Sequence, residues 1–68
     1  MIVELNGRRT EVPEAATVET VVSGLDVDLG RRGVAVAVDA EVVPRSEWRR
    51  RRLRDGAHVE VLTAMQGG

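Results

Sequence analysis

The first thirteen residues have the hydrophobic pattern of a β-hairpin. Residues 1–5 carry an apolar side chain at every second position, the period of a strand with one face on a core. Asn6-Gly7 follows directly, and this dipeptide favours the positive φ angles that a type I′ turn requires. We therefore predict a second strand over residues 8–12, ended by Pro13, which has no N–H for a sheet ladder.

The next apolar residues recur with the period of a helix. They fall at i, i+3, i+4 and i+7, and they are Val18, Val21, Val22 and Leu25. Thr17 is the candidate N-cap, and Gly24 is predicted to supply a left-handed C-terminal position. Because valine is a mediocre helix former, this short helix should depend on docking against a sheet.

Two further strands are predicted in the second half of the chain. Residues 34–38 alternate valine and alanine, and an Asp39-Ala40 turn leads into a short extended piece over residues 41–43. Asp55-Gly56 marks a tight turn before residues 57–63, which alternate cleanly.

Between these strands the chain is irregular. Ser46 is the candidate cap of a brief helical turn that carries Trp48. We expect Trp48 to cover one edge of the core with Leu53 beside it.

Strands with a single helix predict an α+β fold of the β-grasp (ubiquitin-like) kind, a mixed sheet of four to five strands with one short helix on one face. Residues 1–63 form this domain, and residues 64–68 form a flexible diglycine tail. The side chains predicted to face the helix are Val3, Leu5, Thr10, Val12, Val34, Val36, Val38, Val59 and Val61. The opposite, open face carries Ile2, Glu4, Ala35, Ala37, His58, Glu60 and Leu62.

The open face is a candidate docking surface for protein partners. Ala35 and Ala37 are small enough to leave room for a partner's side chains, and Leu62 and Glu60 border them. The alternative is that these are ordinary scattered exposed residues. His58 is expected to be a surface residue beside Glu4 or Glu60.

Composition narrows the possible functions. A chain of 68 residues makes one domain with a simple core, and without cysteine and with one histidine it offers neither disulfides nor a zinc site of its own. No positive leader opens the chain, and the longest apolar run, residues 34–38, is too short for a membrane span, which predicts a cytoplasmic protein with no membrane contact.

The charge balance argues against nucleic acid as a partner. Ten basic residues, all arginine, nearly balance eleven acidic ones, and the net charge is −1. The run Arg49 to Arg52, with Arg54 beyond it, has only Trp48 beside it for base stacking. A solvated charged face or a partner-docking loop is therefore favoured over a nucleic-acid site.

The candidate chemistry lies in the final residues, Met65, Gln66, Gly67 and Gly68. Extended, the five residues after Thr63 reach about 17 Å, and glycines let a backbone pass through a narrow channel. A free α-carboxylate at Gly68, with a reference pKa of about 3.5, is ionised at neutral pH and can attack the α-phosphorus of ATP. A merely disordered terminus is the alternative.

The sequence resembles the ThiS family, the sulfur carriers of thiamine (thiazole) biosynthesis, over nearly its whole length. The resemblance rests on Asn6-Gly7, the helix start at Thr17, VAVAVDAEVVPRSEW over residues 34–48, the turn at residues 53–56 and the terminal diglycine. The Pro44-Arg45-Ser46-Glu47-Trp48 piece favours this family over the small subunits of molybdopterin synthase.

The resemblance implies a protein cosubstrate that is not itself a catalyst. A ThiF-like enzyme adenylates Gly68 with ATP, a thiocarboxylate is installed there, and a ThiG-like thiazole synthase takes the sulfur. We expect the carrier to bind no cofactor and to be monomeric when free. A carrier for molybdopterin or another sulfur acceptor, and a non-covalent ubiquitin-like binding module, remain the alternatives.

Overall fold

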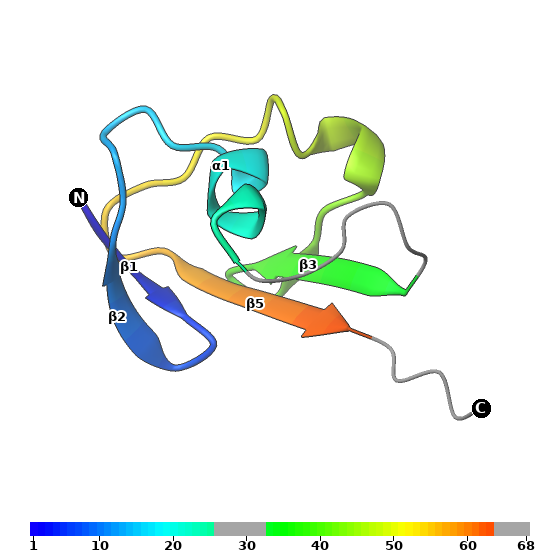
Figure 1. Ribbon diagram of the computed structural model, residues 1–68, viewed down its shortest axis with the longest axis horizontal. Coiled ribbons are helices and arrows are strands. Elements are labelled where there is room, and N and C mark those ends of the chain that lie inside the picture. The colour runs from blue at the N-terminus through cyan, green and yellow to red at the C-terminus, as the bar shows by residue number, and fades with distance from the viewer. Residues whose placement is uncertain (26–32, 64–68) are drawn as a thin grey trace.

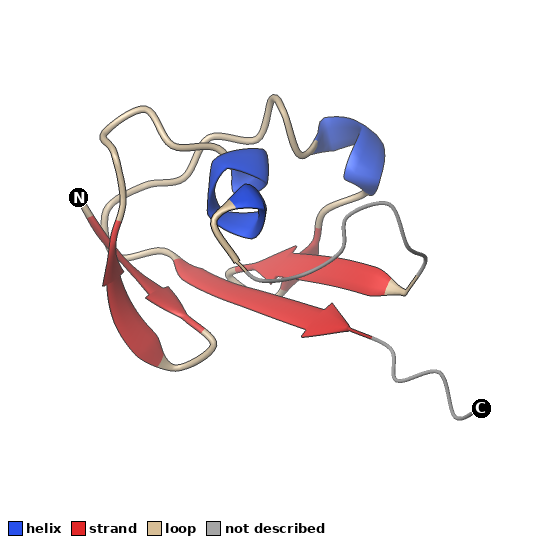
Figure 2. Cartoon of the chain, in the orientation of Figure 1, coloured by secondary structure: helices blue, strands red, loops and turns tan. Residues whose placement is uncertain are grey.

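The computed structural model describes residues 1–25 and 33–63, which form a five-stranded sheet with a short helix on one face (Figure 1). The strands are β1 (Ile2–Leu5), β2 (Arg8–Glu11), β3 (Val34–Val38), β4 (Glu41–Val42) and β5 (His58–Thr63). The helices are α1 (Val18–Ser23) and the 3₁₀ turn η1 (Arg45–Glu47), both on the same side of the sheet (Figure 2).

The strand order is β2-β1-β5-β3-β4, so the last strand of the chain lies in the middle of the sheet. β1 and β5 run parallel, whereas the β1–β2, β3–β4 and β3–β5 pairs are antiparallel. A mixed sheet with one short helix on one face confirms the β-grasp prediction.

Two hairpin turns have positive φ at both central positions. Asn6 and Gly7 have φ angles of 49° and 82°, which confirms the turn predicted between β1 and β2. Asp39 and Ala40, between β3 and β4, have φ angles of 50° and 69°. Alanine rarely adopts this region, because its Cβ crowds the neighbouring carbonyl oxygen.

The predicted start of α1 is confirmed. The Thr17 hydroxyl accepts a hydrogen bond from the backbone N–H of Thr20 (3.3 Å), and the Thr20 hydroxyl accepts one from the N–H of Thr17 (3.1 Å). This reciprocal arrangement is a capping box, and it satisfies two N–H groups that a helix start leaves free.

The predicted end of α1 is wrong in its geometry. Gly24 has φ −79° and ψ −7°, a right-handed conformation. Its N–H donates to the carbonyl of Val21 (3.2 Å), and Leu25 N–H donates to that of Val22 (3.1 Å). Bonds of this i to i+3 kind tighten the last turn and satisfy the carbonyls without a left-handed residue.

The cap predicted at Ser46 is also wrong. Ser46 lies inside η1, whose first flanking residue is Pro44, and no side chain caps the turn. The ring of Pro44 fixes its φ at −59°, and its carbonyl accepts from Glu47 N–H (2.8 Å). Proline therefore begins this turn through its backbone geometry, without a serine hydroxyl.

The core lies between the sheet and α1 and is dominated by valine. Val3, Val18, Val22, Val36 and Val59 are its largest fully buried side chains. Two residues predicted to face the helix, Thr10 and Val34, are only half-buried, because Thr10 is on the edge strand β2 and Val34 begins β3. Over the described ranges, neither helix is long and apolar enough to cross a bilayer.

Trp48 and Leu53 close one edge of the core, as predicted, with 3% and 5% of their surface exposed. The indole Nε1 of Trp48 donates to the Val43 carbonyl (3.0 Å), so its polar atom is satisfied.

Residues 45–54, which we call the arginine segment, are tied by their backbone to the start of α1. The Trp48 carbonyl accepts from Glu19 N–H (3.0 Å) and the Arg51 carbonyl accepts from Val18 N–H (2.9 Å). Leu53 N–H in turn donates to the Ala16 carbonyl (3.0 Å). The segment thus supplies acceptors for helix N–H groups that α1 itself cannot satisfy.

Candidate functional site

The four residues predicted for docking lie together on the open face. Strand register places Ala35 opposite Leu62 and Ala37 opposite Glu60, so all four side chains share one side of the β3–β5 pair. Leu62 is 65% exposed, which is unusual for a large apolar residue in a central strand. This arrangement gives a small apolar patch next to a carboxylate, and its docking role remains a prediction.

Val42 belongs to the same patch, although it was not predicted. It pairs with Ala37 across the β3–β4 hairpin and is 71% exposed. Val43, the next residue, is buried, so the two valines point to opposite faces. The sequence Glu-Val-Val over residues 41–43 does not show which valine faces the core, and Val42 could be placed on the open face only once β4 was known to pair with β3.

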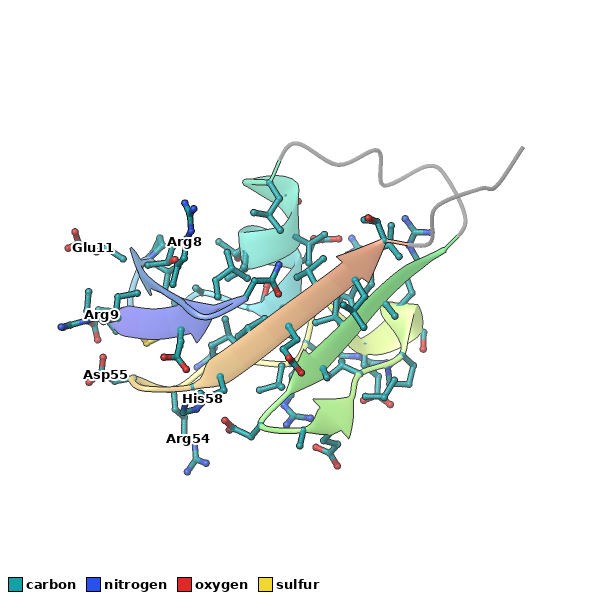
Figure 3. All side chains as sticks on the ribbon, turned by 90° about the horizontal axis from the view of Figure 1, so that it is seen from below. Arg8, Arg9, Glu11, Arg54, Asp55 and His58 are labelled. Carbon is teal, nitrogen blue, oxygen red and sulfur yellow. The ribbon has the colours of Figure 1, made fainter. Side chains whose placement is uncertain are left out.

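His58 lies between two carboxylates on the open face. Its Nε2 is 2.9 Å from Oε2 of Glu4, which confirms the predicted neighbour, and its Nδ1 is 3.8 Å from Oδ1 of Asp39. The same Asp39 oxygen accepts from the His58 backbone N–H (3.0 Å). Figure 3, which views the sheet from below, shows His58 near the start of β5.

An open hollow of about 560 Å³ lies beside this group and is lined by Glu4, Asp39, His58 and Glu60, among others. It carries hydrogen-bonding groups but no serine, cysteine or lysine that would act as a nucleophile. Within residues 1–25 and 33–63, no cluster of three or more His, Cys, Asp or Glu is arranged to hold a metal ion.

The predicted carrier residues, Met65, Gln66, Gly67 and Gly68, lie outside the described residues. The strand before them is firmly held, because β5 pairs with β1 on one side and β3 on the other. Asn6 adds a side-chain clamp: its Oδ1 accepts from Val61 N–H (2.8 Å) and its Nδ2 donates to the Val61 carbonyl (3.2 Å).

Comparison with known protein families shows which family this chain belongs to. The family model described as the ThiS family matches residues 2–68, so the match includes both the sheet and the final diglycine. The chain belongs to the ThiS family. This confirms the family predicted from the sequence, the sulfur carriers of thiamine biosynthesis.

A solved structure agrees with the ThiS assignment. The crystal structure of the thiamine biosynthesis protein ThiS from Geobacter metallireducens is 31% identical in sequence, with a TM-score of 0.79, and the alignment covers 100% of both chains. No curated protein sequence matched the chain. Agreement over the full length of both chains supports the same overall fold for this ThiS-family chain and the Geobacter protein.

Proposed function

We propose that this protein is a sulfur carrier in thiamine biosynthesis and that the terminal carboxylate of Gly68 is the group that carries sulfur. The observation that supports this most strongly is the ThiS family match, which runs through Gly67 and Gly68. The similar structure is that of a thiamine biosynthesis protein. In this role the protein is a cosubstrate that is loaded and unloaded, and partner enzymes perform the chemistry.

The proposed loading has two steps. A carboxylate oxygen of Gly68 attacks the α-phosphorus of ATP in a ThiF-like adenylyltransferase, forming an acyl adenylate and releasing pyrophosphate. A hydrosulfide equivalent then attacks the acyl carbon, and AMP leaves with the bonding electron pair. The product is a thiocarboxylate at Gly68, which a ThiG-like thiazole synthase uses as its sulfur source.

The fold suits this role because it holds β5, the strand from which the tail continues, in the middle of the sheet. β5 is the central strand, and five residues follow Thr63. Extended, they reach about 17 Å, enough to pass from the domain surface into an enzyme cleft. A pair of glycines has no side chains to obstruct a narrow channel.

The test is intact-mass analysis after incubation with ATP, a ThiF-like adenylyltransferase and hydrosulfide. We expect the protein to gain the mass difference between sulfur and oxygen, and peptide mapping should place that gain on Gly68. The chemistry requires a free glycyl carboxylate at a fixed distance from the domain, so a chain lacking Gly68 and a chain with one alanine added after it should stay unmodified.

These two variants also separate the carrier from a non-covalent binding module, which would bind its partners equally well with an altered terminus. Modification of the extended chain, or a gain that maps to another residue, would contradict the proposal. Adding a ThiG-like synthase then tests which molecule accepts the sulfur. Loss of the gained sulfur from the protein, with formation of thiazole, supports a role in thiamine biosynthesis over a role in molybdopterin synthesis.

A further inference from the structure

The arginine segment is the most strongly charged part of the molecule. Residues 45–54 contain six arginines and one glutamate, a net charge of +5, whereas the rest of the chain carries −6 to give −1 overall. The near-zero net charge of the whole protein therefore conceals a strong separation of charge.

The backbone of this segment is held in place, so its arginines project from fixed backbone positions. The carbonyls of Trp48 and Arg51 accept hydrogen bonds from α1, and Leu53 N–H donates to Ala16. Trp48 and Leu53 are buried on the inner side. The arginine side chains between them consequently project from an ordered backbone, which lowers the entropy cost of ordering that backbone when a partner binds.

Some of these arginines are engaged within the protein. Arg51 is 2.9 Å from Glu41, Arg49 is 4.0 Å from Glu19, and the Arg45 guanidinium lies 5.2 Å from the centre of the Trp48 ring. Among the described residues, no carboxylate lies within 4.0 Å of the other three arginines, which are all exposed: Arg50, Arg52 and Arg54.

The arginine segment runs along the helix side of the sheet. Figures 1 and 3 put η1, where it begins, at the same end of the molecule as the end of β5, whereas Figure 3 puts Arg54 at the other end, near His58. An enzyme that takes up the residues after Thr63 thus meets the open face on one side and the η1 end of the arginine segment on the other.

We propose that the arginine segment is a second docking surface, which binds a carboxylate-rich surface of the adenylyltransferase. This inference rests on the proposed function. We name the adenylyltransferase as the partner because it must bind the free carrier before any acceptor takes the sulfur. Clustered positive charge accelerates such encounters with a complementary negative surface.

Protein carboxylates fit this surface better than nucleic acid does. The only aromatic side chain of the protein, Trp48, is 3% exposed and is unavailable for stacking on bases. The rest of the molecule, at −6, would repel a long polyanion that extends beyond the segment.

The test measures adenylation kinetics by pyrophosphate release for Arg50→Glu and Arg52→Glu, made separately. At low salt we expect each to raise KM for the carrier by about threefold to tenfold with kcat unchanged, because steering is lost while the tail chemistry is intact. The difference should shrink above about 0.5 M salt, where charges are screened over a few ångströms.

Two control variants test whether the rise in KM depends on positive charge within the arginine segment. Arg50→Lys keeps the charge and should retain the wild-type KM. Arg8→Glu changes the net charge as much as Arg50→Glu does, but from β2, at the opposite end of the molecule from η1 (Figure 3), and should leave KM unchanged. Circular dichroism checks that every variant is folded.

Each outcome is decisive. The inference is overturned if KM is unchanged in both glutamate variants, or if KM rises equally in Arg8→Glu. In either case, adenylation of the wild-type protein would still support the proposed function. Failure of the wild type to be adenylated overturns both. Tight binding of RNA in a filter assay at physiological salt, lost in Arg50→Glu while KM is unchanged, would assign the segment to nucleic acid instead.

Discussion

Asn6 shows how much one residue contributes to the position of the tail. β1 and β5 are paired through only two residue pairs, Glu4 with His58 and Leu5 with Val59. Beyond them the Asn6 side chain continues the ladder, because its amide bonds both the N–H and the carbonyl of Val61. Asn6 also has a φ of 49°, which asparagine tolerates better than most residues.

Replacing Asn6 by alanine should therefore destabilise the fold by about 2–3 kcal/mol, from two lost hydrogen bonds and the strain of alanine at positive φ. Asn6→Gly loses the same bonds but tolerates the φ, so its loss should be smaller, about 1–2 kcal/mol. Denaturant unfolding measures both. Native-state hydrogen exchange at the Val61 amide should accelerate in each, and unchanged exchange there would refute the clamp.

The sequence predicted the turn at Asn6 but not the hydrogen bonds of its side chain. Asn6-Gly7 predicts a turn because the preference for positive φ is local to the dipeptide. The contact with Val61 spans 55 residues and depends on the register of β5 against β1, which no local pattern encodes. Asp39, which bonds the His58 N–H, was recognised only as a turn residue for the same reason.

At the scale of elements, the sequence patterns predicted every strand and the start of α1, but neither how α1 ends nor how η1 begins. Gly24 and Ser46 have residue types typical of helix ends, yet the chain satisfies those ends with Leu25 N–H and with the ring geometry of Pro44. Several backbone arrangements can satisfy the same free groups, so residue type alone does not select one.

Helix α1 has six residues and is stabilised at its start by two separate devices. One is local, the reciprocal bonds between Thr17 and Thr20. The other is distant, the carbonyls of Trp48 and Arg51. A helix this short is marginal in isolation, so both devices, together with packing on the sheet, account for its presence.

Thr17→Ala should lower stability by about 1 kcal/mol, because it removes the hydroxyl that accepts from Thr20 N–H. In a domain of this size that loss corresponds to a fall in Tm of about 4–8 °C. Thermal unfolding followed by circular dichroism measures it. Thr17→Ser keeps the hydroxyl and should stay close to wild type, and an equal loss in both variants would show that the hydroxyl bond is not the cause.

At the scale of the whole molecule, the two sides of the sheet differ in chemistry. The open face presents apolar residues with carboxylates near them, and the helix side presents the arginine segment. The alternation of β3 and β5 predicted most of the open face. Val42 escaped prediction, because its place depends on how β4 folds back on β3.

The open face can be tested with Leu62→Asp. Leu62 is 65% exposed, so the substitution should leave the stability nearly unchanged while placing an unpaired charge in the docking patch, opposite Ala35. We expect adenylation at limiting carrier concentration to fall about tenfold, the loss typical of one significant interface residue.

Ala15→Asp is the matched control, because it adds the same charge at an exposed site before α1, away from the open face. It should be adenylated at the wild-type rate. If Leu62→Asp is adenylated as fast as this control, the patch does not bind the adenylyltransferase.

The central place of β5 has a consequence for synthesis. β1 and β3 never pair with each other, since the strand made last separates them. A chain that stops before residue 58 lacks the strand that joins the two hairpins into one sheet, so we expect the valines of α1 to have no complete surface to cover. We therefore expect the domain to assemble only after residues 58–63 have been made, so that a chain terminated before β5 would present partner enzymes with neither a folded domain nor a terminal diglycine.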